Sequence, residues 1–128
     1  MSVLAPVSWG ELLDKYTILE LKTERIPDPA KRANVERERQ VLRPFLEQAL
    51  EAQPALASLM ADLKAVNGIL WEVEDEIREW ERRKEFGMRF IELARAVYHE
   101  NDRRALLKRQ LNQLLGSELV EEKSYSEY

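Results

Sequence analysis

Apolar residues recur every three or four positions along most of the chain, which is the repeat of an amphipathic helix. The clearest run alternates spacings of three and four residues, and it comprises Leu56, Leu59, Leu63, Val66, Leu70, Val73, Ile77 and Trp80. A 3.5-residue repeat over more than three heptads is typical of a coiled-coil seam. We therefore predict one long helix from Pro54 to Glu85, about 48 Å in length at 1.5 Å per residue.

Local signals predict where the neighbouring helices begin and end. Ser8 and Glu11 form an S-x-x-E capping box, in which the serine caps a helix that follows and the glutamate reaches back to it. The segment Pro27-Asp28-Pro29 ends that first helix and starts a second one, because proline terminates a helix but suits a first turn. Pro44 lies inside the second helix, so we expect it to kink or divide the helix there.

A fourth helix is predicted from Met88 to Leu115, with Gly116 as its C-cap. Its apolar stripe is interrupted at Asn101 and Arg104, which occupy positions typical of a core. The acidic tail, residues 117–128, is expected to pack loosely along the helices. The predicted fold is an all-α, elongated antiparallel bundle of four or five helices, forming a single domain over residues 1–128.

Composition supports this fold and excludes several classes of protein. Good helix formers dominate the 128 residues, and there is no cysteine for a disulfide or a thiolate zinc site. No apolar run approaches the ~18 residues of a membrane span, and the N-terminus lacks a signal peptide, so we expect a cytoplasmic protein. Acids outnumber bases by 24 to 20. Nucleic acid is therefore not expected, and the basic clusters at 31–43 and 103–109 are expected to meet acidic surfaces.

The long heptad-patterned helix exceeds the ~30–35 Å diameter of a globule of this size. It therefore projects or lies against a second subunit, and we predict a homodimer with Leu63, Leu70, Ile77 and Trp80 at the interface. The pattern leaves open whether the seam lies within one chain or between two. The favoured function is a non-enzymatic assembly or interaction protein with an unidentified protein partner.

The polar interruption of the fourth helix suggests an alternative function. Polar residues at core positions cost free energy unless they are paired, so they indicate either a structural network or a binding pocket. The alternative is a small all-α enzyme or binding protein for an anionic molecule such as a nucleotide or nucleotide-sugar. Its ligand-binding residues are Asn101, Arg104 and Lys108, together with Glu20 and Glu24 on the first helix.

An acidic run on the third helix offers a second chemical hypothesis. Glu72, Asp75, Glu76 and Glu79 share helical faces at spacings of three and four residues, and such carboxylates can hold Mg²⁺. The favoured interpretation is a solvated flank of the seam, because Glu74–Arg78 and Glu79–Arg83 are ordinary helical ion pairs. No cofactor is expected otherwise, since His99 is the single histidine and a di-iron bundle needs two.

Several segments resemble a family of short bacterial helical proteins known only as a domain of unknown function. They are residues 6–15 (PVSWGELLDK), 17–22 (TILELK), Val66-Asn67 with Leu70-Trp71, 101–105 (NDRRA) with Leu107-Lys108, and 121–125 (EEKSY). The resemblance covers nearly the whole chain. It implies a bacterial, stand-alone, cytoplasmic helical protein, and it supplies no catalytic residue and no ligand.

Overall fold

The computed structural model describes all residues from 1 to 128 and contains four helices. They are α1 (Trp9–Arg25), α2 (Pro29–Ala52), α3 (Leu56–Arg82) and α4 (Met88–Leu115). The prediction of an all-α fold is confirmed. None of these helices is both long and apolar enough to cross a bilayer.

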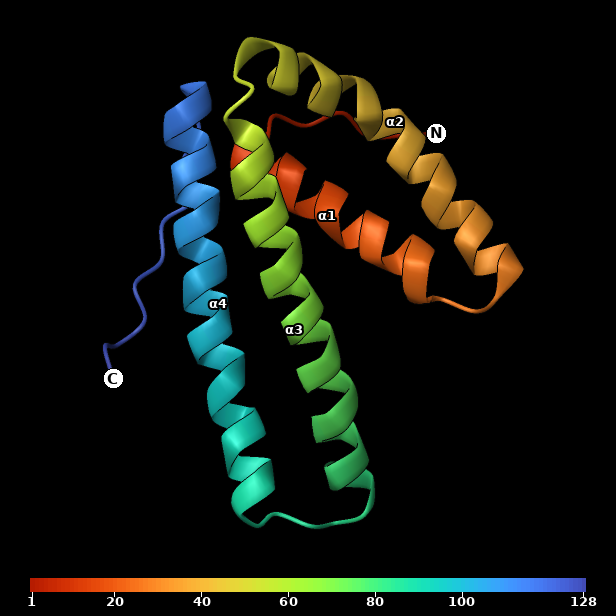
Figure 1. Cartoon of the computed structure of the whole chain (residues 1–128), viewed down its shortest axis with the longest axis vertical. Coiled ribbons are helices and arrows are strands. Elements are labelled where there is room, and N and C mark those ends of the chain that lie inside the picture. Colours follow the sequence, from red (N-terminus) through yellow and green to blue (C-terminus); the bar gives the residue numbers. More distant parts are fainter.

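The four helices form two antiparallel hairpins (Figure 1). Helices α3 and α4 run side by side, and the α1–α2 hairpin lies against one end of that pair. The core at this end takes residues from all four helices: Leu13, Tyr16, Ala49, Leu56, Met60, Leu63 and Leu111. The heptad seam of α3 is therefore covered, over this half, by helices of the same chain.

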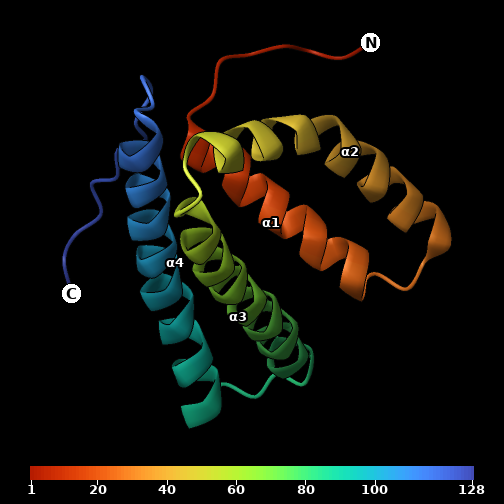
Figure 2. The same cartoon turned by 45° about the horizontal axis from the view of Figure 1, so that its top comes forward.

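The helix ends follow the local signals closely. Ser8 caps α1 by accepting a hydrogen bond from the backbone N–H of Glu11 at 3.1 Å. Asp28 caps α2 in the same manner, and Gly116 ends α4 in the left-handed conformation at a φ of 62°. Helix α2 is not divided at Pro44 but continues through it as one curved helix (Figure 2).

The distal half of the α3–α4 hairpin projects beyond α1 and α2 as a two-helix arm (Figure 1). Arg25, the last residue of α1, donates a hydrogen bond to the carbonyl of Gly68 and lies over the ring of Trp71 at 6.0 Å. We define the arm as residues 72–100, beyond this contact. Within it only Val73 and Leu93 are buried, because two helices alone cannot enclose a core.

Candidate functional site

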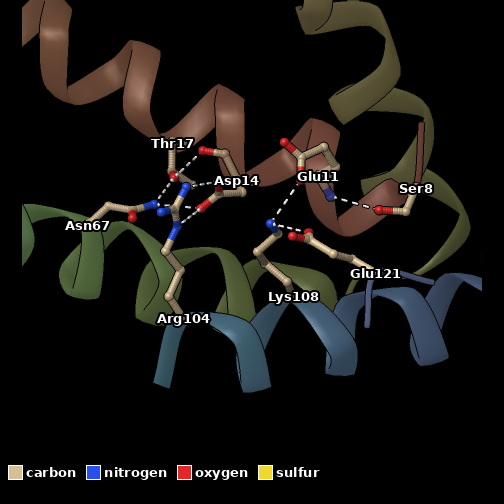
Figure 3. A network of polar contacts seen from close by, with 8 residues as sticks. All are labelled: Ser8, Glu11, Asp14, Thr17, Asn67, Arg104, Lys108 and Glu121. Atoms are coloured by element: carbon tan, nitrogen blue, oxygen red, sulfur yellow. Dashed lines mark hydrogen bonds and ion pairs between the residues drawn. The ribbon is translucent and has the colours of Figure 1, made fainter. Parts of the chain in front are cut away.

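A buried carboxylate joins three helices near the middle of the molecule (Figure 3). Asp14 of α1 is 2 % exposed and receives a bidentate pair from Arg104 of α4, with Nε donating to Oδ1 at 2.9 Å and Nη2 to Oδ2. Asn67 of α3 donates its amide N–H to the same Oδ1 and to the hydroxyl of Thr17, both at 2.9 Å. Thr17 in turn donates to the carbonyl of Asp14. The four side chains thus form one connected network.

This network satisfies its own polar atoms. The hydrogen bonds to Asp14 raise the pKa of Arg104 further above its ordinary value, so the guanidinium stays charged. No buried side-chain nitrogen or oxygen in the chain lacks a hydrogen-bond partner. A polar cluster with every member paired is typical of a structural joint between helices.

Lys108 makes a second junction, one turn of α4 further on. Its ammonium donates to carboxylates of Glu11 on α1 and Glu121 in the C-terminal tail, each at 2.8 Å (Figure 3). Burial lowers the pKa of Lys108, but the two hydrogen bonds outweigh burial and raise that pKa overall. Glu11 therefore binds Lys108, and the prediction that it closes a capping box with Ser8 is not met.

The first turn of α1 packs directly against α4. The backbone N–H of Gly10 donates to Oδ1 of Asn112 at 2.6 Å, and the N–H of Trp9 donates to the hydroxyl of Ser117. A Cβ atom on Gly10 would lie 2.5 Å from the backbone oxygen of Lys108, so only glycine permits this approach. Since residues of α4 and its C-terminus occupy these N–H groups, the start of α1 is not available to bind an anion.

The tail, residues 117–128, lies along α4 and encloses a pocket of about 1010 Å³ with it. Glu122 pairs with Arg109 at 3.0 Å, while Lys123 and the Tyr128 hydroxyl both contact Asp102. The Tyr128 ring packs against the rings of Tyr98 and His99 at centroid distances of 5.0 and 4.6 Å. The tail is thus fixed at several points by its side chains.

The structure brings together only some of the residues predicted to bind an anionic ligand. Asn101, Arg104 and Lys108 do line the pocket beneath the tail. Glu20 and Glu24 do not join them, because both pair with Lys64 of α3, at 3.7 and 2.6 Å. The carboxylates of α1 that reach the α4 bases are instead those of Glu11 and Asp14, about two to four turns earlier on the helix.

The carboxylates proposed to bind Mg²⁺ do not lie close together around one point. Glu76 accepts hydrogen bonds from Arg89 and Trp80, and the Arg89 bond lowers the pKa of Glu76. Glu79 pairs with Arg82 and Arg83, while Glu72 faces Arg25. The chain has no cluster of three or more acidic or histidine side chains placed to hold a metal. Glu72, Asp75, Glu76 and Glu79 therefore behave as the solvated flank of a helix.

The predicted interface residues divide into two groups. Leu63 is fully buried in the core of its own chain, so it is not available to a second subunit, and this part of the prediction is wrong. Leu70, Ile77 and Trp80 are each half-buried. Ile77 and Trp80 lie in the arm, and Leu70 lies just before it, at the level where Arg25 of α1 contacts Gly68 and Trp71.

Sequence reasoning missed Asp14, Thr17 and Asn67, which form the centre of the network. Asn67 did carry a signal, because it is a polar residue next to Val66 in the middle of the α3 seam. Asp14 carried less, since one acidic residue in an amphipathic helix is usually exposed.

Comparisons with protein-family models, with curated proteins and with solved structures find no match to this chain. The family resemblance seen in the sequence stays a prediction.

Proposed function

We propose that this chain is a non-enzymatic assembly protein whose two-helix arm pairs with the arm of a second copy. The observation that carries the proposal is the apolar surface left uncovered at the tip of the arm. Phe86, Met88 and Ile91 are each about half exposed or more, and Phe90 packs edge-on against Phe86. Grouped apolar side chains on a monomer surface mark an interaction site.

Two copies of the arm can together enclose an apolar core, which one copy alone cannot do. Two helices that pack only against each other leave part of their apolar surface exposed to water. A second pair of helices can cover that surface and give a four-helix arrangement with a shared core. Leu70, Ile77 and Trp80 are half-buried in the single chain and would be covered further in such a pair. A homodimer with twofold symmetry uses the same surface on both copies.

The charges along α3 favour an antiparallel pairing of the two arms. Residues 72–76 of α3 carry four acids and no base, whereas residues 82–84, at and just beyond its C-terminal end, carry three bases and no acid. When two such helices lie antiparallel, the acidic segment of each lies beside the basic segment of the other. This complementarity selects the orientation of the pair and disfavours the parallel one.

The engagement of the α4 polar residues also supports an assembly protein over the alternative of an enzyme or anion-binding protein. Arg104 is paired with Asp14, and Lys108 is shared between Glu11 and Glu121. Both cations are therefore neutralised by carboxylates of the same chain. Both line the pocket beneath the tail, but an anion would have to displace one of these carboxylates in order to bind them.

The test is the mass of the full chain in solution, measured by sedimentation velocity over a range of concentrations. The wild-type chain should form dimers. Ile91→Glu should weaken the dimer at least about tenfold, because it places a charge in an apolar contact beside the acidic segment of the partner. Leu106→Glu is the matched control, since Leu106 lies on the same helix outside the arm and is 57 % exposed, against 48 % for Ile91.

Both variants replace an exposed side chain and should fold, which circular dichroism checks. A wild-type chain that stays monomeric at every concentration would refute the proposal. So would an Ile91→Glu variant that dimerises as well as Leu106→Glu.

A further inference from the structure

The C-terminal tail is attached to α4 almost entirely through its side chains. After Ser117, no backbone N–H of the tail donates a hydrogen bond to another backbone group, and the segment forms no helix or strand. Its carboxylates at Glu121 and Glu122 are largely exposed even while paired. The tail is therefore bound as a peptide ligand is bound, on a surface that the helices build without it.

That surface recognises a particular order of charges. The bases Lys108 and Arg109 lie toward the C-terminal end of α4 and receive Glu121 and Glu122. Asp102, nearly two turns earlier on α4, receives Lys123 and the hydroxyl of Tyr128. The tail thus runs antiparallel to α4, with two acids first, then a lysine, then a tyrosine. A peptide with another order would place like charges together.

The helices hold this surface in place independently of the tail. Lys108 is held by Glu11 of α1 as well as by Glu121 of the tail. Tyr98 and His99 pack against each other at 4.9 Å and present their rings to Tyr128. Removal of the tail would leave a basic pair, an acidic residue and an aromatic pair along one helix.

The tail is held weakly enough to be displaced. Exposed ion pairs contribute little free energy, and the tail pairs of Arg109 and Asp102 are of this kind. Gly116, in the left-handed conformation, and Ser117 mark the point where the chain leaves α4. The covalent linkage of the tail to α4 gives it a high local concentration at this surface.

We propose that the α4 groove between Asp102 and Arg109 binds an extended acidic peptide of a partner protein, and that residues 117–128 act as its internal competitor. The peptide carries two adjacent carboxylates followed by a lysine and an aromatic residue. This inference goes beyond the proposed assembly function, because it concerns α4 from Tyr98 to Arg109, whereas the apolar surface proposed for dimerisation lies at the tip of the arm, at Phe86, Met88 and Ile91. Dimerisation and peptide binding can therefore succeed or fail separately.

The experiment uses the full-length chain and a fluorescent synthetic peptide with the sequence of residues 117–128. Binding is measured by fluorescence anisotropy. The chain carrying Glu121→Gln and Glu122→Gln should bind the peptide about tenfold more tightly than the wild-type chain, because its own tail has lost two ion pairs. Both changes lie in the exposed tail and leave the helices intact.

A charge exchange tests the geometry of the contact. Adding Arg109→Glu to that variant should abolish binding of the original peptide. A peptide with Glu122→Lys should then bind the chain that carries Arg109→Glu, and it should not bind the chain that carries only the two tail substitutions. Arg103→Glu is the matched control, since Arg103 is an exposed α4 arginine that pairs only with Glu100, and it should leave peptide binding unchanged.

Three results would overturn the proposal. The first is equal affinity of the wild-type and tail variants for the peptide. The second is binding that survives Arg109→Glu, or that the Glu122→Lys peptide does not restore. The third is displacement of the peptide by inorganic pyrophosphate at equal concentration, which would indicate a site for small anions.

Discussion

The substitution Asp14→Asn isolates the buried ion pair at the centre of the molecule. Asparagine has nearly the same shape and can still accept the hydrogen bond from Asn67, so the packing is preserved. It carries no charge, and its amide nitrogen faces the Nη2 donor of Arg104, with which it cannot form a hydrogen bond. The variant therefore leaves a half-buried guanidinium without its counter-ion.

The expected cost follows from the burial of the two partners. Removal of one member of a buried pair costs about 3–5 kcal/mol. Asp14 is 2 % exposed but the side chain of Arg104 is 29 % exposed, so water recovers part of the loss for Arg104. We expect the free energy of unfolding to fall by about 3 kcal/mol, which lowers the Tm of a chain of 128 residues by about 10 °C.

Urea unfolding followed by circular dichroism measures this difference at a fixed protein concentration. The slope of free energy against urea should not change, because the surface exposed on unfolding is the same. Glu24→Gln is the control, since it removes an exposed pair with Lys64 and should cost less than about 1 kcal/mol. A double-mutant cycle with Arg104→Gln should give a coupling of at least about 1.5 kcal/mol. An Asp14→Asn variant within about 1 kcal/mol of wild type, or a coupling near zero, would refute the reasoning.

Three further predictions test the packing of α1 and the attachment of the tail. Gly10→Ala should lower the free energy of unfolding by about 2 kcal/mol in the same urea assay, because its Cβ would meet the backbone of Lys108 at 2.5 Å; an unchanged midpoint would contradict this contact. Gly68→Ala should instead raise the free energy of unfolding by about 0.5 kcal/mol, because alanine favours the helix. The new Cβ would lie 3.2 Å from the flexible end of the Arg25 side chain, which can move aside. A loss of 1 kcal/mol or more would show that Arg25 cannot move. Acidification should release the tail. The hydrogen bond from Lys108 lowers the pKa of Glu121, and the hydrogen bond from Lys123 lowers the pKa of Asp102. Both carboxylates therefore contribute stability at neutral pH, and this stability is lost as the pH falls through their lowered pKa values. The Tyr128 ring resonances in NMR spectra should shift toward those of a free peptide in that acidic range, and no change on acidification would count against this attachment.

The helices could be predicted from the sequence because their ends depend on local chemistry. The capping serine at position 8 and the Pro27-Asp28-Pro29 segment act on their immediate neighbours, and α1 and α2 begin where they indicate. The predicted third helix from Pro54 to Glu85 exceeds α3 by two or three residues at each end. The prediction of one long third helix was correct because the heptad pattern is itself a local repeat. Two outcomes were expected at Pro44, a kink or a division, and α2 is not divided there, since a helix can bend around one missing hydrogen bond.

The candidate site was predictable only in part because it depends on the register between helices. Arg104 and Lys108 interrupt an apolar stripe, so the sequence alone marks them as residues that need partners. The sequence does not say which turn of α1 faces them. Glu20 and Glu24 were as plausible as Asp14 on charge alone, but they face Lys64 on α3.

Gly10 determines the register that the sequence left open. Its close approach to Lys108 aligns α1 antiparallel to α4, so that Glu11 meets Lys108 and Asp14, one turn further along α1, meets Arg104, one turn earlier on α4. A buried ion pair adds little net free energy over an apolar pair of the same size, but a mismatched one is costly. We infer that the Asp14–Arg104 pair serves mainly to reject other registers. A slip of one turn would separate Asp14 from Arg104 and leave that half-buried guanidinium without its counter-ion.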